Sequence, residues 1–340
     1  MTPVEGAAPA PLPVDTRSRL EAALFEMKRV IVGQETLLER VLVALLTGGH
    51  LLIEGVPGLA KTLTVKTLAE VVGGTHARIQ FTPDLVPSDL VGTRIYRPGG
   101  TFDTELGPVF CNFLLADEIN RAPAKVQSAL LEVMQERQVT IGPASHRVPT
   151  PFLVLATQNP IESEGTYALP EAQLDRFMMK VVVGYPSIPE ELEVVRRSLT
   201  PPAEVSQVLS LDELRTFQEA TAAVFVDRQV AEYAVALVAA TREPAAFGLA
   251  AVGPYVDYGA SPRGSLNLVH GARALALVRG RNYVLPQDIQ ELARDVLRHR
   301  VVLSYQALAE EVTADQVLDA VLGAVPVPHI NLADQQQQAG

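Results

Sequence analysis

The chain has 340 residues, 48% of them hydrophobic, which is enough for a sizeable core and about two domains. Its 28 basic and 39 acidic side chains give a formal net charge of −11, a sign that disfavours non-specific binding to a phosphate backbone, although it leaves room for a local basic channel. Cys111 is the only cysteine, so no internal disulfide can form, and the apolar run around it favours a small buried side chain over a reactive thiol.

The N-terminal segment MTPVEGAAPAPLPVD has neither a basic start nor an unbroken apolar run, so it does not look like a secretory signal. No stretch approaches the roughly 20 apolar residues of a membrane span. The expected location is therefore the cytoplasm. Residues 1–16 and 329–340 lack apolar periodicity, and both are expected to be flexible tails.

The first half of the chain alternates between helical patterns and short apolar runs. Apolar residues at helical spacing predict two amphipathic helices from Arg17 to about Leu45. Five apolar runs follow, separated by helical patterns: 51–53, 77–81, 113–116, 152–156 and 178–183. This alternation predicts an α/β domain over residues 17–186, with a parallel five-stranded sheet covered by helices.

After Tyr185 and Pro186 the strand signal disappears, and the rest of the chain reads as helices. The expected helices span 189–199, 211–224, 228–241, 262–278, 287–298 and 314–322. Ser261 with Pro262 and Pro286 with Asp288 supply the chemistry of helix starts. We expect a small all-α domain over residues 187–328.

One glycine-rich turn has the context of a phosphate-binding loop, because the apolar run at 51–53 leads through it into an amphipathic helix. Backbone N–H groups of such a turn cradle phosphates, Lys61 is expected to reach the β and γ phosphates, and Thr62 is expected to hold Mg²⁺. Ala60 departs from the usual glycine before the lysine. The expected nucleotide-binding residues here are Gly55, Val56, Pro57, Gly58, Leu59, Ala60, Lys61, Thr62 and Leu63.

Two acids end the apolar run FLLADE, which places them at the carboxyl edge of a buried strand. In enzymes with a phosphate-binding loop, the first acid holds Mg²⁺ through water and the second polarises the water that attacks the γ-phosphate. Asp117 is therefore the expected metal ligand, and Glu118 the expected catalytic base. Such a run is a weak signal alone, but its place one strand further along the chain from the glycine-rich turn strengthens it.

The segment FLVLATQN extends these motifs into a resemblance to AAA+ ATPases, because Asn159 stands where that superfamily has its sensor-1 residue. The resemblance makes Arg176, in EAQLDRF, an arginine finger that reaches the ATP of a neighbouring subunit. It also makes Arg263, in GASPR, a sensor-2 residue acting in cis or in trans. The segment Val32, Gly33 and Gln34 then corresponds to the lining of the adenine pocket.

Longer strings resemble the MoxR family, in the helix-2-insert group of AAA+ proteins, over nearly everything between Arg17 and Pro328. These strings are FTPDLVPSDLVG, ADEINRAPAKVQSALLEVMQERQVTIG, ATQNPIESEGTYALPEAQLDRFMMK and DVLRHRVVLSY. The resemblance implies insert hairpins near 92–106 and 138–150, the first of them either pointing into a central pore or decorating the surface. It also implies ATP and Mg²⁺ as cofactors, a homo-oligomeric ring with six subunits, and a protein partner with a von Willebrand factor A domain.

Three other functions stay open at this point. A magnesium-chelatase-like ATPase subunit is a related enzyme, although the wording of the motifs favours MoxR. A nucleotide-gated scaffold with little turnover would be expected to lose some of Glu118, Asn159 and Arg176, all of which this chain keeps. A DNA motor shares the insert architecture, but the acidic charge balance makes nucleic acid an unfavoured partner.

Overall fold

The computed structural model describes residues 16–55, 61–98, 101–159, 165–201 and 203–329. The chain divides into two compact units, each described here by itself. The sheet unit comprises Glu21–Arg215, and the helical unit comprises Thr216–Gly340 together with Met1–Leu20. No helix among the described residues is both long enough and apolar enough to cross a membrane.

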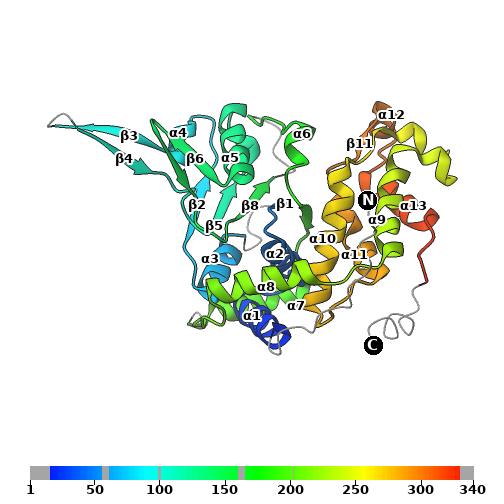
Figure 1. Ribbon diagram of the computed structural model, residues 1–340, viewed down its shortest axis with the longest axis horizontal. Helices are drawn as coiled ribbons and strands as arrows, with labels where there is room; N and C mark the ends of the chain where they lie inside the picture. The colour runs from blue at the N-terminus through cyan, green and yellow to red at the C-terminus, as the bar shows by residue number, and fades with distance from the viewer. Residues whose placement is uncertain (1–15, 56–60, 99–100, 160–164, 202, 330–340) are drawn as a thin grey trace, which may run out of the picture. The chain divides into compact units, whose positions relative to one another are not determined.

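The sheet unit is built on a five-stranded parallel sheet, as the sequence predicted (Figure 1). The order of its strands is β2-β5-β8-β1-β9, and every neighbouring pair is parallel. The bounds are β1 Leu51–Gly55, β2 His76–Gln80, β5 Phe113–Asp117, β8 Leu153–Gln158 and β9 Met179–Val183. Because all five strands run the same way, their carboxyl ends lie along one edge of the sheet.

Helices cover the sheet and bury its apolar strands. The helices of this unit are α2 Glu35–Thr47, α3 Lys61–Val72, α4 Pro87–Val91, α5 Ala124–Glu136, α6 Glu171–Leu174 and α7 Ile188–Ser198, and both α1 Thr16–Val30 and α8 Leu211–Ala223 run across the division between the units. Helix α2 contacts β9, and α3 contacts β2 and β5. Helix α5 shares a core cluster with alternate residues of the strands, such as Leu52, Leu114 and Val154. Burial on both faces explains why the strands read as continuous apolar runs.

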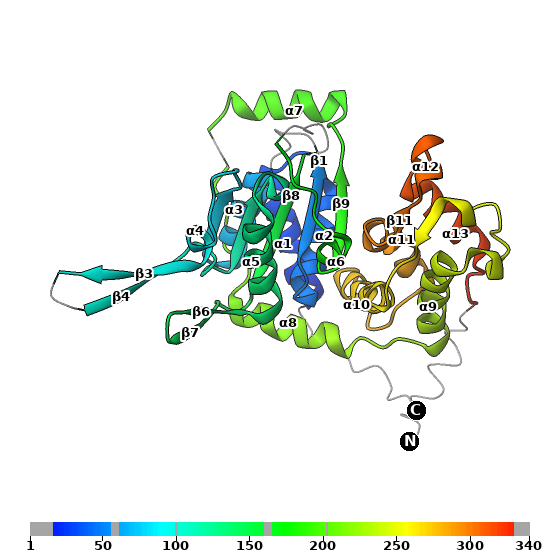
Figure 2. The same ribbon diagram turned by 90° about the horizontal axis from the view of Figure 1, so that it is seen from above.

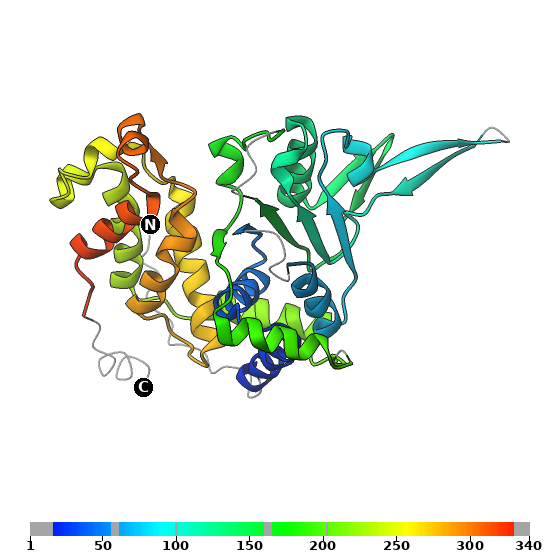
Figure 3. The same cartoon turned by 180° about the vertical axis from the view of Figure 1, so that it is seen from behind.

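Two antiparallel hairpins extend the sheet unit within the ranges where the sequence placed insertions. Strands β3 Gly92–Arg97 and β4 Thr101–Leu106 form the longer hairpin, which projects away from the sheet (Figures 1 and 3). Strands β6 Gln138–Ile141 and β7 Ala144–Arg147 form the shorter one (Figure 2). On the longer hairpin, the rings of Tyr96 and Phe102 pack edge to face with their centroids 5.2 Å apart, and both side chains are exposed.

The helical unit packs around α9 Arg228–Arg242, α10 Pro262–Val278, α11 Pro286–Leu297 and α13 Ala314–Ala324. The Ser261 hydroxyl accepts the Arg263 N–H at the start of α10, as its predicted helix-start role requires. At the start of α11, the buried Asp288 carboxylate accepts the Leu285 N–H at 2.8 Å and two bonds from the Arg281 guanidinium at 2.6 and 2.8 Å. The unit also has a short helix, α12 Tyr305–Ala309.

The helical unit differs from the expected all-α domain in one detail. It contains an antiparallel pair of very short strands, β10 Val256–Tyr258 and β11 Val302–Leu303. Strands of two or three residues leave no detectable alternation in a sequence, so the sequence could not predict this pair.

The division between the units also falls later than the boundary expected at residue 187. Helix α7 belongs to the sheet unit because the Arg197 guanidinium donates to the carbonyls of Lys28, at 3.2 Å, and Arg29, at 2.6 Å, in the last turn of α1. The N–H groups of Val208 and Leu209 donate to the carbonyl of Val71 in α3, at 2.9 and 3.0 Å. An amphipathic pattern does not reveal which core a helix packs on, so composition alone could not place this division.

Candidate nucleotide site

The candidate site lies along the carboxyl edge of the sheet, where three central strands end side by side. Strand β1 ends at Gly55, β5 ends at Asp117, and β8 ends at Gln158 just before Asn159. Ligands of open α/β sheets characteristically bind outside the carboxyl ends of the strands. The parallel topology thus gathers residues that are up to about a hundred positions apart in the sequence.

Lys61 is the first residue of helix α3 and contacts the end of β1. Its ammonium group donates to the carbonyl of Gly55 at 2.6 Å. Partial burial lowers the pKa of Lys61, while the nearby charges of Asp117 and Glu118 act in the opposite direction. Val56, Pro57, Gly58, Leu59 and Ala60 lie outside the described residues, so the consequence of Ala60 for the turn stays a prediction.

The acid pair at the end of β5 is fixed by its neighbour β8. The hydroxyl of Thr157 donates to Asp117 Oδ1 at 2.7 Å and accepts the Glu118 N–H at 2.8 Å. Glu118 has a left-handed backbone, with φ 56° and ψ 52°, a conformation that few non-glycine residues adopt. The turn separates the two carboxylates, and Thr157 holds it in place from inside the sheet.

Three further polar side chains reach the acid pair, and the sequence analysis identified none of them. Two nitrogens of Arg78, Nη2 at 2.7 Å and Nε at 3.2 Å, donate to Asp117 Oδ2. The Gln80 amide donates to Glu118 Oε2 at 2.9 Å, and the Arg121 guanidinium donates to the same oxygen at 3.0 Å. Arg78 and Gln80 alternate on β2, which pairs with β5, so polar alternation in the segment HARIQF was the available signal.

Gln127 of α5 secures the turn that follows the acids. Its buried amide nitrogen donates to the carbonyls of Ile119 at 3.2 Å, Ala122 at 3.1 Å and Tyr167 at 3.0 Å. The Tyr167 N–H in turn donates to the carbonyl of Asn120 at 2.6 Å. The turn beside Glu118 and the segment leading to α6 are therefore held by one buried side chain.

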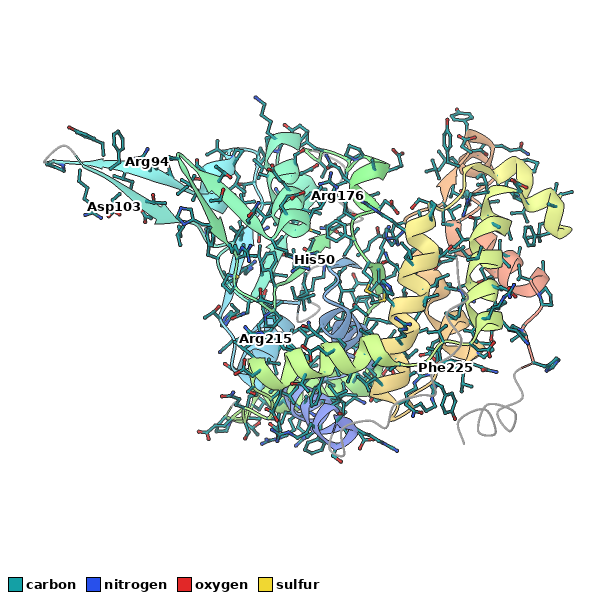
Figure 4. All side chains as sticks on the ribbon, in the orientation of Figure 1. His50, Arg94, Asp103, Arg176, Arg215 and Phe225 are labelled. Carbon is teal, nitrogen blue, oxygen red and sulfur yellow. The ribbon has the colours of Figure 1, made fainter. Side chains whose placement is uncertain are left out.

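The other predicted residues occupy distinct places. Asn159 is buried at the end of β8, next to the acid pair in sheet order. Arg176 is exposed on the turn between α6 and β9 (Figure 4), and Arg263 lies on α10 in the other unit. Thus the structure places Lys61, Asp117 and Asn159 at the carboxyl ends of strands, whereas Arg176 precedes the amino end of β9 in the same unit.

The segment expected to line the adenine pocket links α1 to α2. Val32 is followed by Gly33 with φ 63° and Gln34 with φ 57°, so the chain turns sharply here. The Gln34 amide donates to the carbonyl of Gly184 at 3.4 Å, and a side chain at Gly33 would meet Glu190. The segment therefore packs against the start of α7.

The donors at this edge fit Mg²⁺ bound together with a nucleotide. Among the described residues, no three His, Cys, Asp or Glu side chains gather to form a metal site by themselves. Thr62, on the exposed first turn of α3, and Asp117 offer a hydroxyl and a carboxylate, which are hard oxygen donors. Mg²⁺ typically takes one or two such protein ligands and completes its shell with water and phosphate oxygens.

Comparisons with known proteins agree with this geometry. The model of the ATPase family associated with various cellular activities (AAA) matches residues 50–179, and the model of the AAA lid domain matches residues 249–321. The chain is 59% identical to Chaperone MoxR1 of Mycobacterium tuberculosis, over 93% of this chain and 84% of that protein. It is 32% identical to Protein MoxR of Paracoccus denitrificans, over 92% and 98% of the two chains.

A solved structure, described as a putative ATPase from Cytophaga hutchinsonii, superposes with a TM-score of 0.88 at 48% identity, covering 92% of this chain and 96% of that one. This similarity and the two family models bear out the predicted core with its helical lid domain. The chain belongs to the MoxR family of AAA+ ATPases.

Proposed function

We propose that this chain hydrolyses ATP in a Mg²⁺-dependent manner within a ring of identical subunits, and that hydrolysis drives the remodelling or activation of a protein partner. Membership of an ATPase family supports nucleotide binding. The observation that carries the catalytic part is the meeting of Lys61, Asp117 and Glu118 at the carboxyl edge of the sheet.

In this proposal, Lys61 exchanges its contact with the Gly55 carbonyl for the β and γ phosphates. The contact that it leaves is a single hydrogen bond of 2.6 Å within a partly buried corner. Thr62 and Asp117 would hold Mg²⁺, which would supply positive charge against the phosphates. The low local polarity that depresses the pKa of Lys61 also strengthens its attraction to phosphate oxygens.

Glu118 is the proposed base for the attacking water. Within the described part of the chain, Gln80 and Arg121 both donate to Oε2. These bonds orient the carboxylate and leave Oε1 to accept a proton from water. Asn159, buried at the end of the adjacent strand, is proposed to position the same water or the γ-phosphate.

The proposed ring gives Arg176 its role. Its side chain is exposed on a turn of the sheet unit, where a neighbouring subunit's nucleotide could receive it. Arg263 is the corresponding candidate in the helical unit, acting in cis or in trans. Because a finger acts across an interface, turnover should depend on assembly.

The proposed partner is a protein with a von Willebrand factor A domain, and this part rests on family membership. M. tuberculosis MoxR1 is named a chaperone. The projecting β3–β4 hairpin offers exposed aromatic rings for contact with a client, and Arg94 stacks over the Phe102 ring at 4.5 Å. We propose that this hairpin faces the ring's central pore.

Glu118→Gln tests this function. The amide keeps the shape but lacks the basicity, so nucleotide binding should persist while turnover falls to background. Glu132→Gln, an exposed glutamate on α5, is the matched control and should keep full activity. Hydrolysis at the wild-type rate by the Glu118 variant would refute the proposed base.

The same variant, loaded with ATP, is the bait for the partner. A von Willebrand-type protein captured by it, but not by the nucleotide-free chain, supports the proposed coupling. Capture of DNA alone, or of porphyrin-pathway proteins alone, would favour a DNA motor or a chelatase subunit instead.

A further inference from the structure

Strand β2 delivers a positive charge to the carboxylate that is proposed to hold the metal ion. Arg78 and Asp117 form an ion pair in which Nη2 and Nε both contact Oδ2, at 2.7 and 3.2 Å. The Asp117 side chain is only 17% exposed, whereas that of Arg78 is 49% exposed. A guanidinium therefore covers a largely buried acid from the solvent side.

Arg78 takes up acceptor capacity that a metal ion needs. A carboxylate has about four acceptor positions, two on each oxygen. Two donors from Arg78 fill Oδ2, and the Thr157 hydroxyl takes one position on Oδ1. About one position remains for a water molecule bound to a metal ion. A divalent ion beside Asp117 would also be repelled by the guanidinium charge.

We propose that Arg78 is a resident counter-cation of Asp117 that competes with Mg²⁺, so that metal–nucleotide binding requires its guanidinium to withdraw from Oδ2. This inference rests on the proposed function, since it assumes that Asp117 holds the metal of a bound nucleotide. Competition between two cations for one carboxylate sets the Mg²⁺ concentration at which the loaded state forms. Arg78 therefore tunes the metal requirement of the site without touching the nucleotide.

The position of Arg78 makes withdrawal easy. Half of its side chain already meets solvent, so the released guanidinium can be hydrated. It also donates to the Gln80 amide oxygen at 2.8 Å, and the Gln80 nitrogen donates to Glu118. Movement of Arg78 therefore reaches the second acid through one side chain. A metal ion at Asp117 would therefore affect the orientation of the Glu118 carboxylate through Arg78 and Gln80.

The test measures binding and needs no turnover. A fluorescent, non-hydrolysable ATP analogue is held at fixed concentration with the full-length protein. Mg²⁺ is first removed with EDTA and then added stepwise, and binding of the analogue is measured at each concentration. Arg78→Gln removes the competing charge, so the Mg²⁺ concentration at half-saturation should fall about fivefold, the scale of a partly exposed ion pair. Arg78→Lys keeps the charge but loses the two-donor contact, and should fall between wild type and Arg78→Gln.

Arg97→Gln is the matched control, because Arg97 forms an exposed ion pair with Asp103 on the β3–β4 hairpin. It should leave the midpoint unchanged. An unchanged or higher midpoint in Arg78→Gln would overturn the inference. So would weaker binding of the analogue by that variant in EDTA, because Arg78 would then be contacting phosphate. If Arg78→Gln does not fold, the Arg78→Lys midpoint decides. A wild-type chain that binds no nucleotide would instead overturn the proposed function itself.

Discussion

The two edges of the same sheet use charged and polar side chains in opposite ways. At the amino edge, the buried His50 ring accepts the Val154 N–H at 3.0 Å and donates to the Met134 carbonyl at 3.1 Å. Arg137 donates to the carbonyls of Phe152 and Gly48. Each of these bonds joins a side chain to the backbone, so breaking one leaves a backbone group unpaired.

At the carboxyl edge, the carboxylates of the two acids are bonded to other side chains. Arg78 holds Asp117 and Arg121 holds Glu118, and both arginines are partly exposed. Lys61 donates to the Gly55 carbonyl, a contact that we propose a phosphate replaces. The side chains at the amino edge are therefore fixed by bonds to the backbone. The ion pairs at the carboxyl edge are partly exposed, so a ligand could replace them. Arginine occurs at both edges, but Arg137 bonds to backbone carbonyls whereas Arg78 and Arg121 bond to carboxylates.

The largest expected effect on turnover belongs to Arg176, which lies apart from the carboxyl edge. Arg176→Ala should bind ATP but hydrolyse it roughly 10³ to 10⁵ times more slowly, because a finger stabilises charge on the transferring phosphoryl group. Steady-state turnover and analogue binding measure the two properties. Loss of binding together with turnover would show that Arg176 supports the fold and not the chemistry.

Mixing Arg176→Ala with Glu118→Gln sharpens the same prediction. Subunit exchange should create interfaces that carry an intact Glu118 on one side and an intact Arg176 on the other. Recovered activity that rises with protein concentration is expected for action in trans. If exchange is demonstrated and the mixture stays inactive, Arg176 acts in cis or the ring needs all its sites intact. A ring of covalently linked subunits, only one of them mutated, separates these two explanations.

Substitutions at the amino edge should change the stability of the fold and leave nucleotide binding unchanged. His50→Leu leaves a backbone N–H and a backbone carbonyl unpaired in the core, so the free energy of unfolding should fall by about 2–5 kcal/mol. Where the variant is folded, its ATP affinity should equal that of wild type. His76→Leu, at an exposed position that begins β2, is the control and should cost less than about 0.5 kcal/mol. A loss of less than about 0.5 kcal/mol of unfolding free energy for His50→Leu would contradict this structural role.

The His50 imidazole should also make the free energy of unfolding depend on pH, with a smaller effect per pH unit. Burial and the nearby Arg137 charge lower the pKa of His50 from 6.5 to about 3. The unfolded chain therefore binds a proton below pH 6.5 while the folded chain does not. The free energy of unfolding should fall by about 1.4 kcal/mol per pH unit between these values, and show no dependence on this group above pH 6.5.

Denaturant unfolding of wild type and His50→Leu across pH 4 to 8 isolates this contribution, because the variant should lack it while keeping every other titrating group. If the free energy of unfolding changes with pH in the same way for both proteins, the His50 imidazole has the same pKa in the folded and unfolded states.

The sequence was informative wherever function needs residues that are adjacent in the chain. The five strands, the acid pair and Lys61 at the start of its helix were all placed correctly, because apolar runs and local motifs carry that information. The thiol of Cys111 is buried, and burial raises its pKa to about 12, in keeping with its predicted structural role.

Two of the missed residues at the acid pair depend on the order of the strands in the sheet, whereas Arg121 lies only three positions after Glu118. Arg78 and Gln80 meet the acids only because β2 lies beside β5. His50 finds its partners 84 and 104 positions away. The structure divides after Arg215, later than residue 187, because residues 197, 208 and 209 form bonds to α1 and α3 that a local sequence pattern cannot reveal.

The measurement that tests the central claim most directly is ATP affinity by calorimetry for wild type, Lys61→Ala and Lys66→Ala. Both lysines lie on α3, but Lys66 is exposed and pairs with Glu70 at 3.7 Å, so it serves as the control. If the carboxyl edge is a phosphate site, Lys61→Ala should abolish tight binding, while Lys66→Ala should bind as wild type does. Equal affinity in all three proteins would contradict a nucleotide site at this edge.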